Sequence, residues 1–183
     1  MVLLTELIQR IADAASSPNS WVLAYSGGKD SSFTLKLFWE AMRKGYMPGS
    51  SLKILHCDTG SDNPLSSLAT LRTLTRLKAE AATLGLAISI HIVRPEPHRR
   101  LLVRIVGRGY PPPNTFFRWC TKDIRIRPVE TFLDSALSDT DILVLGVRKG
   151  ESAQRDRSFT LNDNPIWTEQ KEGKIRRRIF LPI

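Results

Sequence analysis

Residues 21–38 have the sequence WVLAYSGGKDSSFTLKLF, and this stretch decides the fold. The apolar run at 21–25 has the length of a buried strand, and apolar residues recur at helical spacing from 31 to 44. Two glycines between a strand and a helix let the backbone turn sharply and present unpaired N–H groups to an anion. Serine and lysine side chains add further donors. We therefore predict a polyphosphate-binding loop made of Ser26, Gly27, Gly28, Lys29, Asp30, Ser31 and Ser32.

The rest of the chain repeats the alternation of strand and helix. Further apolar runs predict strands at 52–57, 87–93 and 141–146. Amphipathic spacing predicts helices at 2–16, 64–84 and 128–137, with a short helix near 98–107 and another that begins around 121. The expected fold is therefore α/β, a parallel doubly wound sheet with helices on both faces. The last residues, IRRRIFLPI (175–183), are expected to be exposed.

Length and composition indicate one globular domain over residues 1–183, with an irregular proline-rich insertion near 107–120 and a basic C-terminal segment at 171–183. The 42% hydrophobic and 25% charged residues are typical of globular proteins and exclude a disordered tail or a fibre. No run of 18 apolar residues occurs, and the N-terminus is amphipathic, so we expect no membrane span and no export signal. Two cysteines are too few for a disulfide framework, which favours a cytoplasmic location.

Ligands of such sheets bind beyond the carboxyl ends of the strands. The segments that follow the four predicted strands, 26–32, 58–62, 94–122 and 148–155, should therefore form one site. Asp58 and Thr59 are expected to contact the ribose or adenine of a nucleotide. A strand-end turn stabilised by an Asx hydrogen bond is nearly as good an interpretation of Asp58-Thr59-Gly60.

The loop sequence SGGKDS resembles the PP-loop of the ATP pyrophosphatase superfamily, which cleaves ATP between its α and β phosphates. GRGYPPPNTFFRWCTKDIRIRP (107–128) and LGVRKGESAQR (145–155) resemble one branch, the DndC/SspD-like sulfurtransferases of bacterial DNA phosphorothioation. The resemblance runs from residue 21 to about residue 157. It implies an adenine nucleotide alpha hydrolase-like fold, ATP with Mg²⁺, a DNA substrate, and a cysteine desulfurase and other phosphorothioation proteins as partners.

The downstream motifs supply the remaining candidate residues. Arginine is suited to bidentate contacts with phosphate, and a nearby carboxylate can orient an arginine or hold Mg²⁺. We expect Arg148, Glu151 and Arg155 to bind the nucleotide. The expected catalytic residues are Lys29, Arg118, Cys120 and Arg148. Arg125 and Arg127 lie two positions apart and would not share a helix face, so one of them is expected to be structural or solvated.

Cys120 follows Arg118 and precedes Lys122, a setting in which cations stabilise a thiolate. Such a thiolate can accept a persulfide sulfur or act as one ligand of an iron–sulfur cluster. The resemblance implies a cluster held by several cysteines, and one thiolate cannot hold it alone, so a cluster would need a longer chain or a partner. The competing interpretation is an inert buried thiol. Cys57 lies within a predicted strand and is expected to belong to the core.

The charge distribution fits a phosphate-rich partner. Residues 91–130 hold nine basic and three acidic side chains, and residues 171–183 hold five and one. A surface of this kind can face DNA, although a solvated basic face that keeps the protein soluble is an equally good interpretation.

Two other functions stay open. One is a PP-loop enzyme with a small substrate, such as a phosphoadenylyl-sulfate reductase or a sulfate adenylyltransferase subunit. Resemblance to the reductases is weaker. Those that carry a cluster have an adjacent cysteine pair in the region where Trp119 precedes the single Cys120, and those that use thioredoxin have a cysteine near the C-terminus, where this chain has LPI. Reduction is therefore disfavoured. The other is a non-catalytic nucleotide- or DNA-binding fragment, since the chain ends earlier than the family pattern.

Overall fold

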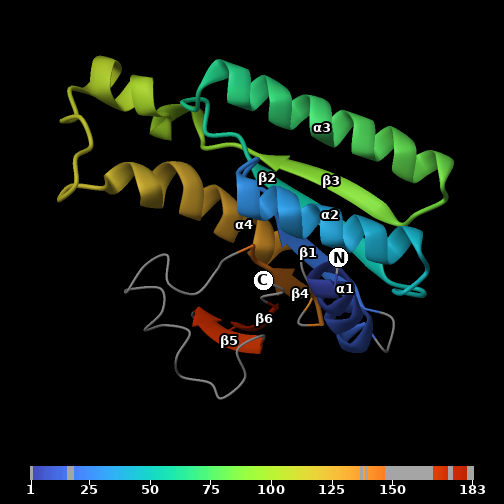
Figure 1. Cartoon of the computed structure of the whole chain (residues 1–183). Coiled ribbons are helices and arrows are strands. Elements are labelled where there is room, and N and C mark those ends of the chain that lie inside the picture. The colour runs from blue at the N-terminus through green and yellow to red at the C-terminus, as the bar shows by residue number, and fades with distance from the viewer. Residues whose placement is uncertain are drawn as a thin grey trace.

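The computed structural model describes residues 2–15, 19–136, 138, 140–146, 167–172 and 175–180. They form a six-stranded sheet with the strand order β3-β2-β1-β4-β6-β5 (Figure 1). Five strands are parallel, and only β5 runs antiparallel, at the edge beside β6. The strands are β1 Ser20–Ala24, β2 Ser51–Cys57, β3 Ile88–Val93, β4 Ile142–Val144, β5 Trp167–Glu172 and β6 Ile175–Phe180. The predicted parallel α/β architecture is confirmed.

Helices cover both faces of the sheet. The regular helices are α1 Val2–Ala14, α2 Lys29–Arg43, α3 Pro64–Thr83 and α4 Arg127–Ala136. Three short helical segments lie between β3 and α4, namely the 3₁₀ turn η1 Pro97–Arg99 and the π-helical segments η2 Val103–Gly107 and η3 Thr121–Ile126. The segment η3 runs directly into α4, so the two helices expected near 121 and 128 are continuous.

The core lies mainly on the face that α1 and α2 cover. Trp21 of β1, Phe38 of α2 and Phe180 of β6 are fully buried there and meet edge to face, with ring centroids 5.4 to 6.3 Å apart. On the opposite face Val22 and Leu55 pack against Leu133 of α4. Successive residues of a strand point to opposite faces, which is why Trp21 and Val22 belong to different clusters.

The C-terminal residues differ from the sequence prediction. Residues 175–180 form β6, which pairs with β4 over Ile142↔Arg178 to Val144↔Phe180, and Ile179 and Phe180 are buried. The expectation of an exposed stretch is therefore wrong for Ile179 and Phe180, while residues 181–183 lie outside the described residues. The run Arg176–Arg178 has a charge pattern typical of a solvated tail, but tertiary pairing with β4 and burial of the next two apolar side chains outweigh it.

The helix boundaries agree more closely. Asn63 Oδ1 accepts a hydrogen bond from the Leu65 N–H at 2.9 Å, and Pro64 occupies the first turn, so the expected cap of α3 is present. The helix α2 begins at Lys29, two residues earlier than expected, which brings Lys29 and Asp30 into its first turn. Within the described residues, no helix combines the length and the apolar character that a membrane crossing requires.

Candidate functional site

The loop 26–32 joins β1 to α2 at the carboxyl end of the sheet. Gly28 is the N-cap residue of α2 and makes no side-chain cap hydrogen bond, and the start of a helix favours an anion electrostatically. Ser26 and Ser31 hold the loop together, because their hydroxyls lie 3.0 Å apart and the Ser31 hydroxyl donates to the Gly28 carbonyl at 3.0 Å. The two serines thus shape the loop from within, whereas the Lys29 side chain is exposed.

Two glycines let other elements approach the loop closely. Gly27 has φ = +78°, and a Cβ atom at this position would overlap Oγ1 of Thr70, a buried residue of α3. A Cβ atom on Gly146 would lie 2.7 Å from Thr34 Oγ1 and 3.0 Å from the Asp30 carbonyl oxygen. The chain that leaves β4 therefore passes directly beside the first turn of α2.

The turn 58–62 follows β2, the neighbour of β1 in the sheet. Asp58 accepts from the Gly60 N–H at 3.1 Å and from Arg94 Nε at 2.9 Å. Partial burial opposes ionisation of Asp58, but the hydrogen bonds from Arg94 and Gly60 outweigh it and lower the pKa of this carboxyl. Thr59 is buried and its hydroxyl donates to Asp62 at 2.7 Å. The Asx-turn interpretation of Asp58 is thus present in the structure, beside the loop 26–32.

The segment η3 packs on the end of β2. The Cys57 thiol donates to the Ile124 carbonyl at 3.5 Å, and Arg125 forms an ion pair with Asp62 at 2.9 Å. Burial raises the pKa of Cys57 to about 11, so this thiol is neutral. Cys57 is nevertheless only partly buried and lies outside both core clusters, so the expectation that it belongs to the core is wrong. Arg125 and Arg127 are both ion-paired, the latter to Asp123 at 3.2 Å, which gives both of them structural contacts.

Cys120 immediately precedes η3 and is partly buried. It lies about one helical turn before Ile124, the residue that contacts Cys57. Arg118 is exposed and has no ion-pair partner among the described residues. Ile124 and Arg125 thus place η3, the segment that directly follows Cys120, beside the turn 58–62.

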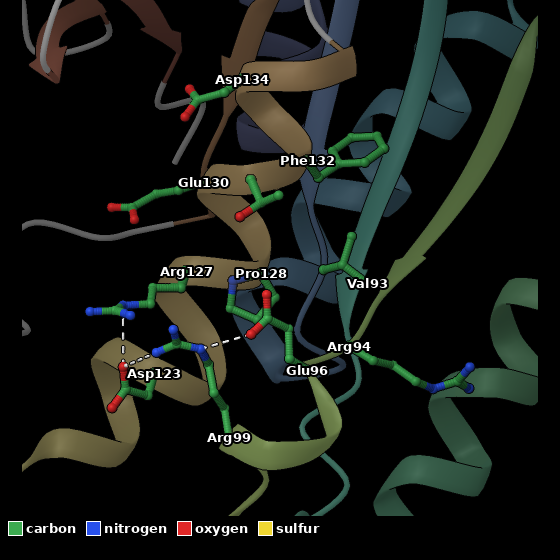
Figure 2. A pocket seen from close by; sticks show the side chains of 11 residues that line it. Val93, Arg94, Glu96, Arg99, Asp123, Arg127, Pro128, Glu130, Phe132 and Asp134 are labelled. Atoms are coloured by element: carbon green, nitrogen blue, oxygen red, sulfur yellow. Dashed lines mark hydrogen bonds and ion pairs between the residues drawn. The ribbon is translucent and has the colours of Figure 1, made fainter.

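An ion-pair cluster around Asp123 fixes the base of the proline-rich segment. The buried Asp123 carboxylate accepts from Arg104 at 2.6 Å, and Arg99 and Arg127 lie 3.4 and 3.2 Å away. Figure 2 shows Arg99 between Asp123 and Glu96. Asp123, Arg99 and Arg127, but not Arg104, line a hollow of about 500 Å³ between the end of β3 and α4. None of its lining residues belongs to the loop 26–32 or the turn 58–62, and each arginine in it is already ion-paired.

A second hollow, of about 360 Å³, adjoins the loop. It lies between α2 and α3 and is bordered by Tyr25, Ser32, Trp39 and Arg76. This hollow, unlike the larger one, shares a residue with the predicted phosphate loop. Arg148, Glu151 and Arg155 lie outside the described residues. Among the residues that the structure does describe, no group of three histidine, cysteine or acidic side chains is arranged to hold a metal ion.

A known protein family matches most of the chain. The model of the phosphoadenosine phosphosulfate reductase domain matches residues 20–180. The chain belongs to this family. A phosphoadenosine phosphosulfate reductase domain is a PP-loop enzyme domain, which agrees with the strand, loop and helix at 20–43. No curated protein matches the chain.

Several residues that shape this phosphoadenosine phosphosulfate reductase domain have roles that the sequence does not reveal directly. Thr70 of α3 lies directly against Gly27, and Gly146 allows the chain after β4 to lie close to the first turn of α2. The ion pair of Arg104 and Asp123 holds the start of the proline-rich segment. Thr70 and Gly146 act through close approach to a distant segment, which carries no local sequence signal. Arg104 and Asp123 have one, since a lone acid after 26 residues without Asp or Glu predicts a shared counterion.

Proposed function

We propose that the protein is the ATP-dependent sulfurtransferase component of a DNA phosphorothioation system. The observation that carries the proposal is the loop 26–32, a φ-positive glycine turn with an uncapped helix start at the carboxyl end of a parallel sheet. Membership of a PP-loop enzyme family supports ATP as the nucleotide. Residues 97–122 contain six basic and no acidic side chains, which supports an anionic polymer as the second substrate.

The proposed reaction activates a poor leaving group. A non-bridging oxygen of a DNA phosphate attacks the α-phosphorus of ATP, the bond to the β-phosphate breaks, and pyrophosphate leaves. The DNA phosphate is then part of an anhydride with AMP. A cysteine desulfurase supplies sulfane sulfur, which forms a persulfide on Cys120, and the outer sulfur of this persulfide attacks the DNA phosphorus and expels AMP together with the former non-bridging oxygen. A thiol reductant then cleaves the remaining S–S bond, which leaves the phosphorothioate on the DNA and the oxidised thiol as a disulfide.

The protein contributes position and charge in this proposal. The N–H groups at the start of α2 and the Lys29 ammonium bind the β and γ phosphates and stabilise the charge that develops on pyrophosphate. Arg118 and Arg148 bind the phosphates that react, and Cys120 receives the sulfur. Asp58 and Thr59 shape the turn beside the loop through Gly60 and Asp62, and their contact with the adenosine remains part of the proposal.

Mg²⁺ enters with the ATP phosphates, as is common where the metal keeps several waters and takes one or two carboxylates. Glu151 and Arg155 remain the proposed neighbours of this ion and the phosphates. An iron–sulfur cluster does not fit the described cysteines. The Cys57 thiol is neutral and donates a hydrogen bond to the Ile124 carbonyl, so Cys120 is the one described cysteine that could act as a ligand. No step is therefore routed through a cluster.

The experiment that tests the proposal follows the formation of labelled AMP from α-labelled ATP, and pyrophosphate release in parallel, with and without duplex DNA. Lys29→Ala should lose ATP binding or pyrophosphate release while the fold stays intact. Lys44→Ala is the matched control, because Lys44 is an exposed lysine at the opposite end of the same helix and should leave turnover unchanged. Equal turnover of wild type and Lys29→Ala would contradict the proposal.

A second candidate is reduction of an adenylyl sulfate, which the name of the matching family favours. It predicts sulfite formation from phosphoadenylyl sulfate with a thiol reductant and no requirement for DNA. Sulfite release that Cys120→Ser abolishes would favour this candidate over the sulfurtransferase.

A further inference from the structure

The proline-rich segment presents the ring of Phe116 almost completely to solvent, in a hydrogen-bonded turn in which the neighbouring Phe117 is only about half as exposed. Phe116 is 99% exposed, although phenylalanine is ordinarily a core residue. Asn114 Oδ1 accepts hydrogen bonds from the N–H groups of Phe116 and Phe117 at 2.9 and 2.8 Å, and the Asn114 N–H donates to the Phe117 carbonyl at 3.3 Å. The turn 114–117 therefore holds the ring outward, where it has no packing role.

The base of the segment is rigid. The Arg104 guanidinium carbon lies 4.9 Å from the centre of the Tyr110 ring and 5.2 Å from that of Trp119, and the two rings meet edge to face at 5.7 Å. Trp119 Nε1 donates to the Pro111 carbonyl at 3.1 Å. Arg104 is in turn paired with Asp123. Both ends of the segment 110–119 are thus fixed to the body of the domain before any partner binds.

The charge around this turn has one sign. Residues 97–122 contain six basic side chains and no Asp or Glu. Arg99 and Arg104 are paired with Asp123, but Arg108, Arg118 and Lys122 are exposed and have no ion pair within the described part of the chain. In Figure 1 the segment projects on the side where the parallel strands end. An exposed ring among unpaired cations complements a strand that alternates bases and phosphates.

We propose that Phe116 stacks on an unpaired DNA base while Arg108, Arg118 and Lys122 contact the neighbouring phosphates. The choice of DNA rests on the proposed function, and the inference adds how the strand is held and which ring holds it. A pre-formed turn loses little conformational entropy on binding, which suits recognition without sequence readout. Stacking also requires a base that is out of its duplex, so single-stranded DNA should bind more tightly than duplex DNA.

The test measures the affinity of the full chain for a fluorescein-labelled 20-nucleotide single strand and for the same sequence as duplex, without ATP. Phe116→Ala should weaken single-strand binding by about 5- to 150-fold, and Phe116→Trp should retain it. Val106→Ala is the matched control, because Val106 is an exposed apolar residue, 81% accessible, that cannot stack. Equal losses in Phe116→Ala and Val106→Ala, or no loss in either, would overturn the inference.

The proposed binding of phosphates is tested by salt dependence. Each phosphate that a side chain neutralises on a single strand contributes about 0.7 to the slope of log affinity against log salt. Arg118→Ala should therefore make this slope shallower by about 0.7 if Arg118 neutralises one phosphate, whereas Lys44→Ala should leave it unchanged. An unchanged slope in Arg118→Ala would contradict the role of Arg118.

The same measurements separate this inference from the proposed function, because DNA affinity is read without turnover. Phe116-dependent binding without pyrophosphate release would overturn the proposed function alone. Turnover with Phe116-independent binding would overturn this inference alone.

Discussion

Gly27 of the phosphate-binding loop lies directly against the buried side chain of Thr70 in α3. The contact leaves no room for a Cβ atom, and the φ of +78° disfavours one independently. The helix α3 thus supports the loop from behind, and the position and shape of the loop depend on an element that begins 37 residues later in the chain.

Gly27→Ala should destabilise the protein more than Gly45→Ala does. Gly45 has a similar φ of +74° but open space around its Cα, so alanine there costs only backbone strain, about 1–2 kcal/mol. At Gly27 the overlap with Thr70 adds about 1–3 kcal/mol. Chemical denaturation of both variants measures the difference.

The double variant Gly27→Ala/Thr70→Ala separates the two causes. Removing Oγ1 relieves the overlap and leaves the strain, so the unfolding free energy and the ATP affinity should both recover in part. If the double variant is no more stable than the sum of the two single destabilisations predicts, the contact between the two residues does not shape the loop.

Asp123→Asn should loosen the proline-rich segment. Loss of this carboxylate leaves the buried Arg104 guanidinium without its counterion, which costs about 3–5 kcal/mol. Tryptic cleavage after Arg108 and Arg118 should accelerate in the same variant. Glu96→Gln is the control, because Glu96 is 62% exposed and solvent screens its pair with Arg99, so its loss should change stability little. Equal effects of the two changes would contradict the anchoring role of Asp123.

The sequence predicts the fold well because its signals are local. Each of β1 to β4 is an apolar run bounded by turns, and the cap Asn63-Pro64 marks α3. The strand β6 is not predicted, because three consecutive arginines precede its apolar residues and hide the pattern of a buried strand. Its partner β4 also lies about 30 residues earlier in the chain, so no local signal marks the pairing. Its place in the sheet comes from a pairing that only the folded chain reveals.

The candidate site is less predictable than the fold. The loop 26–32 is visible in sequence because glycines and a helix start carry its chemistry locally. The sequence also shows the one-signed charge of 97–122, but it does not show which arginines Asp123 neutralises, because those pairs join η1, η2 and α4. It likewise could not show that Phe116 points outward, since the ring could equally have packed on the core.

Glu40 should give the stability a measurable dependence on acid pH. Hydrogen bonds from Lys36 and then Arg43 lower the pKa of Glu40 to about 2, from 4.5. A carboxyl whose folded-state pKa is depressed stabilises the protein fully above its unfolded pKa, and this contribution disappears as the pH falls from 4.5 to 2. Because Lys36 and Arg43 are exposed, the contribution is about 1 kcal/mol at most. Thermal unfolding of wild type and Glu40→Gln should differ at pH 7 and converge near pH 2, and a constant difference would contradict this assignment.

The two cysteines should differ in reactivity. Burial raises the pKa of Cys57 to about 11, and its thiol donates a hydrogen bond to the Ile124 carbonyl. Near neutral pH almost no Cys57 thiolate is therefore present. Cys120 begins a helical segment between the exposed cations Arg118 and Lys122, and we expect iodoacetamide to label it first. Labelling of Cys57 should rise steeply as the pH approaches 11 or when the protein unfolds.

Mass spectrometry of the native protein after timed exposure to iodoacetamide measures both sites, and Cys57→Ser and Cys120→Ser assign the signals. Pre-incubation with a persulfide donor should add one sulfur atom to the Cys120 peptide, and iodoacetamide should then label the outer sulfur of this persulfide. Slow and equal labelling of the two thiols near neutral pH would make Cys120 an inert residue. The sulfur-accepting step of the proposed reaction would then have no acceptor in this chain, and only the ATP-activating step would remain.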